Sequence, residues 1–498
     1  MFVHELISQG NSQSIVFQGP HPVSYRQLQD EVNQYRKYFY AQGITAGENV
    51  GLISRNSAEY IYSYMAVISL GAVIVPLNFQ LSTREIAYIV KDAKMKFLIT
   101  MEEVDITGHL QQMNYHEAVE QLIIPRFKPV LSRNVFSEVP DLTGHTEDEH
   151  CVIIYTSGTT GVPKGAMLSH INLISNAVAF HQVLNVTPAD NVLCVLPMYH
   201  CFAWTCAVLN TLLCGASMTI LDGFSPKETL AAIRDNTVTV VYGVPPMYNI
   251  LARVGEPADL GSVRIFVSGG AALPEKVAER FVQKYDKHIL EGYGLSEASP
   301  VVSLNPPGQT KPGSIGRALP GLIVTVFDEN DHEVPAGQVG ELVVKGPSVM
   351  KGYFNLPEET AQVLRGSWLH TGDLAYKDQD DYFFIVDRLK DMIITNGENI
   401  YPREIEELLY AYPGIMEAAV IGMEDKLRGQ QAVAYLVLTE GDQLDKKKLR
   451  DYLVENLAAY KVPREFILVD ALPKNTTGKI LKRALREQQF PIHSAWED

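Results

Sequence analysis

Short apolar strands alternate with helix-like segments from about Tyr25 to Leu230, and this alternation constrains the fold more than any other feature of the sequence. The segments TAGENVGLISRN (residues 45–56) and SLGAVIVPLN (residues 69–78) are two of the predicted strand regions. Strands that alternate with helices form layered α/β structures with largely parallel sheets. We therefore expect an α/β fold for the first half of the chain.

The pattern changes twice further along the 498-residue chain, which is long enough for several structural units. Residues 313–387 read as strands joined by Gly, Pro, Asn and Asp turns, which predicts a β-rich subdomain within an N-terminal domain over 1–387. The polar segment VDRLKD contains a predicted hinge at 388–391. Beyond the hinge, a helix, two strands and a second helix predict a small α+β domain over 392–498.

Composition excludes several classes of protein. The formal net charge is −16, whereas a broad nucleic-acid-binding surface needs clustered Lys and Arg. Five cysteines without CxxC spacing, and an N-terminus without a basic and apolar leader, favour a cytoplasmic protein with reduced thiols. No charged residue lies between Asp190 and Asp222, but Pro, His and Gly interrupt this stretch. We expect buried strand and helix there, and no stable membrane insertion; peripheral membrane contact and a homodimer stay open.

The loop YTSGTTGVPKG (residues 155–165) is poor in side chains that pack in a core. It follows the predicted strand CVIIY, and ligands of α/β sheets bind beyond strand ends. Glycines free backbone amides for anions, and a lysine adds positive charge, so the loop suits a polyphosphate. It is not a Walker A loop, because Pro163 and Gly165 flank the lysine. The alternative is a flexible surface loop. The predicted phosphate-binding residues are Thr156, Ser157, Gly158, Thr159, Thr160 and Lys164.

This loop resembles the signature loop of the adenylate-forming superfamily, which includes acyl-CoA synthetases, peptide-synthetase adenylation domains and firefly-type luciferases. EGYGLSEASP (residues 291–300) resembles the family's next motif. The resemblance implies that Gly292, Tyr293 and Gly294 hold adenine and that Ser296, where the family usually has Thr, contacts the α-phosphate. It also implies that Glu297, with Thr156, binds magnesium. Gly270 and Ala271 of VSGGAALP are assigned to the same nucleotide site.

Further motifs follow in the family's order and extend the resemblance from about residue 20 to 486. GELVVKGPSVMKGYFN and WLHTGDLA match two of them, and Asp373 in the second resembles the carboxylate that accepts hydrogen bonds from both ribose hydroxyls. Arg388 resembles the second ribose contact, and Lys390 occupies the hinge position. Lys479 in LPKNTTGKILKR lies where the family has its catalytic lysine. The alternative for Asp373 is that it caps a turn, and the alternative for Lys479 is that it is a solvated charge.

The resemblance implies a two-step reaction that uses ATP, Mg²⁺ and CoA. A carboxylate attacks the α-phosphate of ATP, and an acceptor thiol then takes the acyl group from the adenylate. Cations and fixed donors must offset the repulsion between the anionic reactants. The family turns its mobile C-terminal domain about the hinge between the two steps. Gly397, Arg428 and Lys461 are the candidate CoA contacts.

Two stretches, LPMYHCFAWTCAVL and VYGVPPMYNIL, together with VSGGAALP, resemble the walls of the family's acyl pocket. His200 is placed near the carboxylate, while Trp204 is either the gate of an acyl tunnel or a core aromatic. The predicted pocket also contains Tyr242, Val244, Met247 and Gly269. VYGVPPMYNIL and VSGGAALP contain no charged residue, and an α-ammonium group would need a buried carboxylate, so an apolar acid is favoured over an amino acid.

The function expected from the sequence is therefore ATP-dependent ligation of a carboxylic acid to CoA. The expected acid is a medium- or long-chain fatty acid. The first alternative is a ligase for aryl or other carboxylic acids. The remote alternative is a non-catalytic protein that binds acyl groups or adenylates on the same fold. A luciferase-type oxygenase is more remote still and would require light emission.

Overall fold

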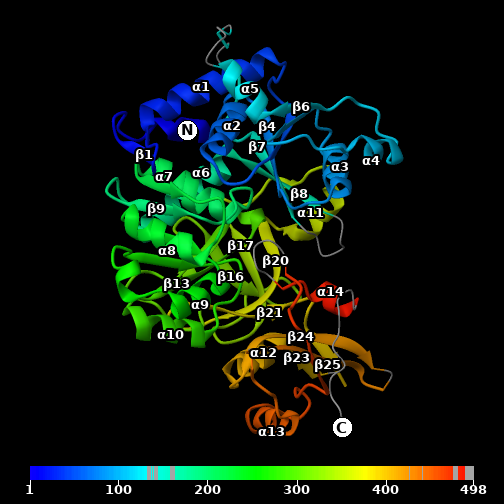
Figure 1. The fold of residues 1–498 in the computed structure, drawn as a ribbon. Helices are drawn as coiled ribbons and strands as arrows, with labels where there is room; N and C mark the ends of the chain where they lie inside the picture. The colour runs from blue at the N-terminus through cyan, green and yellow to red at the C-terminus, as the bar shows by residue number, and fades with distance from the viewer. Residues whose placement is uncertain are drawn as a thin grey trace.

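The structure is a computed structural model, and it describes residues 1–131, 136, 138–139, 144–156, 163–396, 398–425, 427–439, 441–474 and 480–487. Figure 1 shows a large α/β body and, below it, a smaller unit that contains the last helices and strands. This arrangement confirms the predicted fold class, with layered α/β sheets, a β-rich part and a small α+β unit after it.

A nine-stranded sheet forms one half of the body, in the order β15-β14-β13-β12-β11-β9-β10-β1-β2. The strands from β1 to β13 along this order are parallel, and β2, β14 and β15 join antiparallel at the two edges. The bounds are β1 Ile15–Gln18, β2 Val23–Ser24, β9 Asn191–Cys194, β10 Ser217–Ile220, β11 Val240–Gly243, β12 Ile265–Ser268, β13 Ile289–Gly294, β14 Val301–Leu304 and β15 Arg317–Ala318.

A seven-stranded sheet forms the other half, in the order β18-β8-β7-β4-β3-β5-β6. Strands β7 and β8 pair antiparallel, with Thr156 opposite Lys164, so the predicted phosphate loop connects two neighbouring strands. The bounds are β3 Asn49–Ile53, β4 Val73–Leu77, β5 Phe97–Thr100, β6 Glu120–Ile123, β7 His150–Thr156, β8 Lys164–Ser169 and β18 Gly352–Tyr353.

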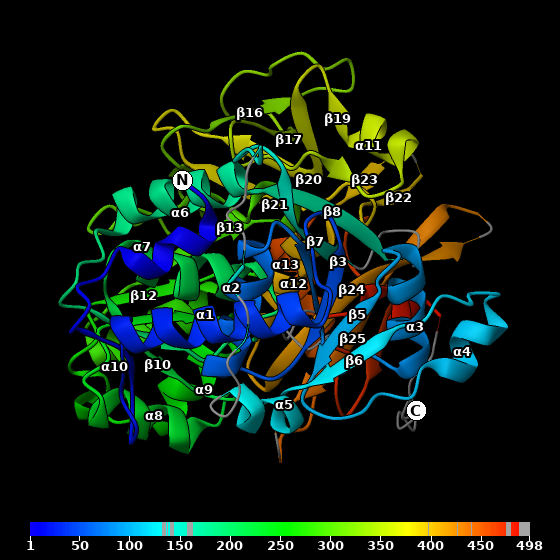
Figure 2. The same cartoon turned by 90° about the horizontal axis from the view of Figure 1, so that it is seen from above.

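The helices of the body follow the strands as the alternating pattern predicts. Helix α2 is buried on nearly every side because it lies between the two large sheets (Figure 2). Ser24 caps α1, since its side chain accepts the amide hydrogen of Gln27, and Gln27 accepts that of Ser24. The helices are α1 Tyr25–Ala41, α2 Ala58–Ser69, α3 Thr83–Asp92, α4 Thr107–Gln112, α5 Ile124–Leu131, α6 His170–Leu184, α7 Asn210–Leu213, α8 Pro226–Asp235, α9 Pro245–Val254, α10 Glu275–Tyr285 and α11 Pro357–Val363; shorter helical segments are η1 Val3–Ser8, η3 Pro257–Leu260 and η4 Ser296–Ala298.

The stretch without charged residues is buried strand and helix, as the sequence predicts. It contains β9, the π-helical segment η2 (Ala203–Leu209), α7 and β10, and every residue of η2 is buried. In the part of the chain that the structure describes, no helix is long and apolar enough to cross a membrane.

Antiparallel strands form the β-rich layer, in the order β16-β17-β20-β19, with β21 paired to β20. Their bounds are β16 Ile323–Phe327, β17 Gly340–Lys345, β19 Leu364–Arg365, β20 Trp368–Lys377 and β21 Phe383–Arg388. Strand β21 ends two residues before Lys390, so this layer leads directly into the C-terminal unit.

The C-terminal unit has its own apolar clusters on the two faces of a five-stranded sheet. Leu409, Leu449 and Leu453 belong to one cluster, and Ile421 and Leu485 to the other. Helix, strand, strand and helix follow one another as the sequence predicts. The bounds are β22 Ile393–Thr395, β23 Glu398–Ile400, α12 Pro402–Ala411, β24 Ile415–Asp425, β25 Gly429–Leu438, α13 Lys446–Asn456, β26 Glu465–Leu468 and α14 Lys482–Arg486.

One ion pair ties the starts of two central strands of the nine-stranded sheet. Arg264, just before β12, donates from Nε and Nη2 to Asp190, just before β9, over 2.8 and 2.7 Å. Burial favours the neutral acid, but Arg264 and hydrogen bonds from Thr187 and Thr239 lower the pKa of Asp190 to about 2. Because this folded value is below the usual 3.8, the carboxylate stabilises the fold above pH 4, and that stability is lost as pH falls from 4 through 2.

We expect Asp190→Asn to lower the apparent melting temperature at pH 7. The substitution leaves Arg264 without its carboxylate, which costs about 2 kcal/mol when the half-exposure of the guanidinium is taken into account. Differential scanning fluorimetry from pH 7 to 3 measures the effect, and the wild type and the variant should converge at the acidic end. Asp235→Asn breaks an exposed pair with Arg234 and is the matched control. An equal loss of melting temperature in both variants would contradict a stabilising role of the Asp190–Arg264 pair.

Candidate active site

Three predicted nucleotide contacts meet at one carboxylate. Tyr293 on β13 donates its hydroxyl hydrogen to Oδ2 of Asp373 on β20 over 2.5 Å. Arg388 on β21 lies opposite Asp373 in the strand register, and its Nε is 3.1 Å from Oδ1. Burial and the nearby carboxylate raise the pKa of Tyr293 well above its usual value, so the phenol stays a donor. Asp373 is only 5% exposed, so both partners hold its charge in a fixed position.

The glycines of the same motif allow close backbone approach. A Cβ at Gly294 would overlap the carbonyl group of Pro300, and one at Gly292 would lie 3.0 Å from Leu304. Gly270 adopts φ +78°, a left-handed conformation that glycine tolerates best. Gly270 and Ala271 lie between β12 and α10, beyond the carboxyl end of a parallel strand, where α/β sheets bind ligands.

Only part of the predicted phosphate site falls within the described residues. Thr156 ends β7, and its hydroxyl lies 3.5 Å from the carbonyl oxygen of Lys164. The ammonium group of Lys164 lies over the ring of Tyr353, 5.4 Å from its centroid. The predicted contacts Ser157, Gly158, Thr159 and Thr160 lie outside the described residues, as do Gly397 and Lys479.

Glu297, the predicted magnesium ligand, is held by the same tyrosine. The Tyr353 hydroxyl donates to Glu297 Oε1 over 2.9 Å, and the carbonyl oxygen of Glu297 accepts the amide hydrogen of Met350. Among the described residues, no group of three or more His, Cys, Asp or Glu could hold a metal ion by itself. A single held carboxylate still fits Mg²⁺, because this ion usually binds one or two carboxylates together with substrate phosphates.

The predicted α-phosphate contact lies beside the predicted acyl site. The Ser296 hydroxyl is 3.3 Å from the thiol of Cys201. The neighbouring His200 accepts the backbone amide hydrogen of Phe202 at Nδ1 over 3.2 Å. Because Nδ1 is an acceptor, a neutral His200 carries its proton on Nε2 and can donate it to a carboxylate.

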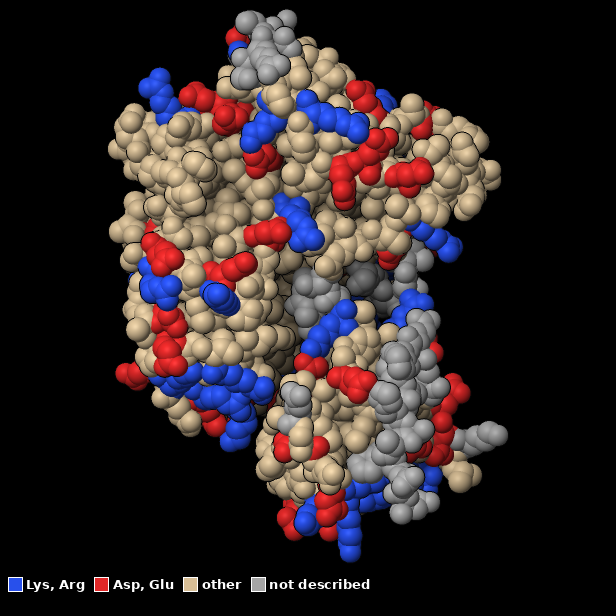
Figure 3. All heavy atoms as spheres, in the orientation of Figure 1, with Lys and Arg blue, Asp and Glu red and all other residues tan. Residues whose placement is uncertain are grey.

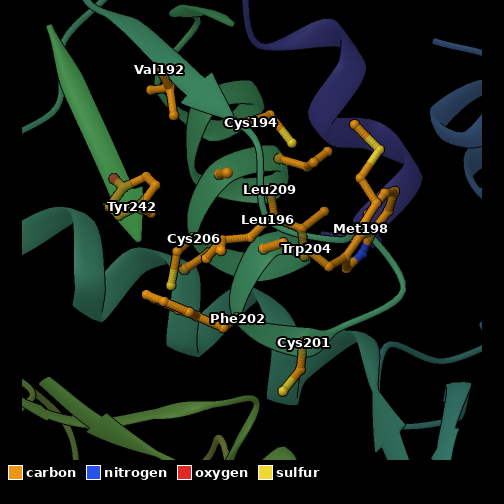
Figure 4. Packing of buried hydrophobic residues seen from close by; sticks show 14 of the residues in the cluster. Val192, Cys194, Leu196, Met198, Cys201, Phe202, Trp204, Cys206, Leu209 and Tyr242 are labelled. Atoms are coloured by element: carbon orange, nitrogen blue, oxygen red, sulfur yellow. The ribbon is translucent and has the colours of Figure 1, made fainter. Parts of the chain in front are cut away.

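The predicted acyl-pocket residues lie on both sides of η2. Trp204 is 3% exposed, and its ring centroid is 3.8 Å from that of Tyr64 and 5.8 Å from that of Tyr60, both on α2. Figure 4 shows Trp204 beside Met198, whereas Tyr242 on β11 lies on the opposite side of the helical segment. Trp204 is therefore packed as a core aromatic in this structure.

Phe202 closes the other side of the predicted pocket. Its ring lies edge-on to Tyr242 at 6.3 Å, and a Cβ added to Gly269 would be only 3.2 Å from it. Val244 and Met247 begin the next helix, α9, and both are buried. These side chains make an apolar wall.

A cavity of about 320 Å³ lies where the body meets the C-terminal unit. Figure 3 shows a hollow between these two parts. The cavity is lined by Arg388, the predicted hinge residue Lys390 and three neighbours, Thr371, Gly372 and Leu389. It therefore adjoins the group formed by Tyr293, Asp373 and Arg388, which we call the Asp373 cluster.

The two described CoA candidates already have acidic partners. Lys461 donates to both carboxylate oxygens of Glu404, at 2.8 and 2.7 Å, and Arg428 contacts Asp425 at 3.3 Å. Both lie in the C-terminal unit, and the structure does not bring them to the Asp373 cluster.

Sequence reasoning missed two contacts of the site. Tyr353 joins Lys164 to Glu297, and Cys201 contacts Ser296. Tyr353 belongs to the motif GELVVKGPSVMKGYFN, so its motif membership was a signal. Cys201 follows His200 directly but gives no signal of its own, because a cysteine among apolar residues is typical of a core.

Comparison with known proteins agrees with this geometry. Residues 6–354 match the model of the family described as AMP-binding enzyme, and residues 404–479 match the AMP-binding enzyme C-terminal domain. The chain is 37% identical over 470 residues to a feruloyl-CoA synthase from Amycolatopsis, covering 94% of both chains. It is 36% identical over 497 residues to a long-chain-fatty-acid–CoA ligase from Bacillus subtilis, covering 92% of this chain and 88% of that one.

Among solved structures, o-succinylbenzoate coenzyme A synthetase from Bacillus subtilis, in complex with ATP and a magnesium ion, superposes with a TM-score of 0.87. It is 29% identical, and the match covers 98% of each chain. The shared architecture therefore extends over both the body and the C-terminal unit.

We expect Asp373→Asn to weaken AMP binding by about 10- to 100-fold, because the amide removes a buried charge that orients two donors and accepts from a ligand. Isothermal titration calorimetry with AMP measures the effect. The control is Asp381→Asn, which removes a charge from the exposed turn between the same two strands. Unchanged AMP affinity in Asp373→Asn would place the nucleotide elsewhere.

Proposed function

This chain belongs to the AMP-binding enzyme family, and we propose that it is an AMP-forming acyl-CoA synthetase for medium- or long-chain fatty acids. The general activity, ATP-dependent ligation of a carboxylic acid to CoA, fits the family match. It also fits the relatives, which include ligases named for an aryl acid and for fatty acids. ATP, Mg²⁺ and CoA are the expected co-reactants.

The apolar character of the acyl wall carries the choice of a fatty acid. Phe202, Val244 and Met247 are buried and apolar, and Tyr242 is fully buried. An amino-acid substrate would bury an ammonium group here without a carboxylate partner, which is costly. Burial of an alkyl chain would instead stabilise the complex, by roughly 25 cal/mol for each Å² of apolar surface removed from water.

The residues of the site divide the first half-reaction among them. His200 donates from Nε2 to the acid's carboxylate, and Ser296 donates to the α-phosphate. Asp373 accepts from the ribose, while Lys164 and the loop before it hold the phosphates that leave. Glu297 and Thr156 would hold Mg²⁺, and the bound ion would neutralise phosphate charge. Lys479 bridges the carboxylate and the α-phosphate, whose like negative charges would otherwise repel each other.

An aryl-acid ligase is the second candidate. Phe202 and Tyr242 offer aromatic faces and edges that can pack against a planar ring. The similarity to a feruloyl-CoA synthase supports this candidate, because its sequence identity of 37% is about the same as the 36% to the long-chain-fatty-acid–CoA ligase.

The test is an assay with ATP, magnesium and CoA across straight-chain acids and benzoate- and cinnamate-type acids, in which AMP and thioester are measured together. We expect AMP and thioester in equal amounts, with kcat/KM highest at one alkanoate length. A maximum on a cinnamate-type acid would favour the second candidate, and AMP without thioester would mean that CoA is the wrong acceptor.

We expect Lys479→Ala to abolish adenylation but spare thioester formation from supplied acyl adenylate, because the lysine is needed only while the carboxylate attacks the phosphate. Pyrophosphate exchange measures the first half-reaction, and thioester formation from synthetic adenylate measures the second. Lys474→Ala removes a lysine that pairs with Glu417 and is the control. Equal loss of both half-reactions would refute this division of roles.

A further inference from the structure

Glu291 has a buried carboxyl group that the reaction described above does not use. It lies on β13, two residues before Tyr293, and is 5% exposed. Its Oε1 accepts the backbone amide hydrogen of Leu273 over 3.0 Å. Its own carbonyl oxygen accepts two hydrogen bonds from Asn305, one from the backbone and one from the side chain. The backbone of Glu291 is therefore fixed by Asn305, and its carboxyl group contacts the loop that contains Leu273.

That loop, residues 269–274, joins β12 to α10 and carries three predicted site residues: Gly269, Gly270 and Ala271. Ser268, the last residue of β12, lies opposite Glu291 in the parallel register. The loop thus leaves the sheet beside Glu291 and is tied back to it at Leu273. Because Gly270 is exposed and has φ +78°, the loop's conformation depends on such fixed points.

The charges that face Glu291 come from two helices. Arg403 and Glu407 lie on α12 of the C-terminal unit, and Glu275 begins α10. Burial raises the pKa of Glu291 to about 7, while Arg403 and the Leu273 amide act in the opposite direction and favour the carboxylate. Glu291 therefore changes its charge close to neutral pH, in contrast to an exposed glutamate.

Arg403 is itself fixed against the body. Its Nη1 donates to the carbonyl oxygen of Ile385 on β21 over 3.0 Å, and its backbone amide donates to Asp387 over 2.9 Å. One guanidinium contact and one backbone contact of Arg403 thus cross the predicted hinge, while its Nε donates to Glu407 on the same helix over 3.0 Å. The charge that favours ionised Glu291 depends on this docking of the C-terminal unit.

We propose that Glu291 is a positioning residue of the nucleotide site: its carboxylate, favoured by Arg403 of the docked C-terminal unit, anchors the loop 269–274 through the Leu273 amide. The inference rests on the proposed function for the role of the loop, but not for the anchoring itself. A hydrogen bond to a charged acceptor is stronger than one to a neutral acceptor, so the loop is held more firmly when Glu291 is ionised.

The test compares Glu291→Gln and Glu291→Leu with the wild type at pH 6 and pH 8. Glutamine keeps an acceptor for Leu273 without the charge, and leucine removes both. We expect the KM for ATP of Glu291→Gln to equal that of the wild type at pH 6 and to be about three- to tenfold higher at pH 8, with kcat changed less than twofold. Glu291→Leu should raise the KM at both pH values. The variant-to-wild-type ratio cancels the titration of the nucleotide's own phosphates.

Two control variants separate this role from general electrostatics. Glu275→Gln removes a nearby charge that does not contact Leu273, and it should leave the ratio near one at both pH values. Arg403→Gln should move the wild-type pH dependence to higher pH, because it removes the charge that favours the carboxylate. A Glu291→Gln ratio that is the same at both pH values, or a Glu275→Gln ratio that matches it, would overturn the proposal.

A second measurement needs no ligase activity. Hydrogen exchange of the segment that contains Leu273 should be faster in Glu291→Leu than in the wild type, and at pH 8 AMP should bind more weakly to Glu291→Gln in calorimetry. If no acid is activated but these two effects are observed, the proposed function fails and the anchoring stands. If acids are activated but Leu273 exchange is unchanged in Glu291→Leu, the anchoring fails and the proposed function stands.

Discussion

The pairing of Asp373 with Arg388 and Tyr293 is the interaction on which the geometry of the site depends. A carboxylate that is 5% exposed is tolerated only if it is paired and hydrogen-bonded. Its partners come from two sheets, because Tyr293 belongs to the nine-stranded sheet and Arg388 to the β-rich layer. The same contacts therefore stabilise the junction of two layers and fix the charge that a ribose would meet. Since Arg388 ends β21, this junction also sets the position from which the C-terminal unit starts.

The elements of the fold could be predicted well from the sequence, because each has a local signal. Alternating strands and helices predicted the α/β layers, and the stretch without charges between Asp190 and Asp222 is buried strand and helix. In the C-terminal unit the predicted helix, strand, strand and helix are α12, β24, β25 and α13. The periodicity of apolar residues predicts these elements, and it can be recognised within about ten to fifteen residues.

Contacts between distant segments could not be predicted in the same way. The hydrogen bond from Tyr353 to Glu297 joins residues 56 positions apart, and the bond from Leu273 to Glu291 joins residues 18 positions apart. The motif resemblance supplied Asp373, Arg388 and Tyr293 as members of one site, and the structure shows which atoms meet. The identity of the acid is still less legible, because it depends on how the rings of Phe202 and Trp204 fill the volume between η2 and its neighbours, and no motif encodes that packing.

The charges around the predicted hinge explain how the C-terminal unit could turn at a limited energetic cost. Arg486 pairs with Asp391 at 2.6 Å and Lys482 with Glu406 at 2.8 Å, and all four residues follow Lys390 in the chain. These pairs would move together with the unit. Arg403, by contrast, is bonded to Ile385 and Asp387 on the other side of Lys390. A rotation about Lys390 would break these two contacts of Arg403 but keep its pair with Glu407 on the same helix, and water would replace the lost hydrogen bonds at the exposed surface. The two partly buried pairs, whose separation would leave uncompensated charges, stay intact. Glu291 would lose Arg403, its favourable neighbour, together with the smaller opposing charge of Glu407 on the same helix, so its charge and the position of the C-terminal unit are linked.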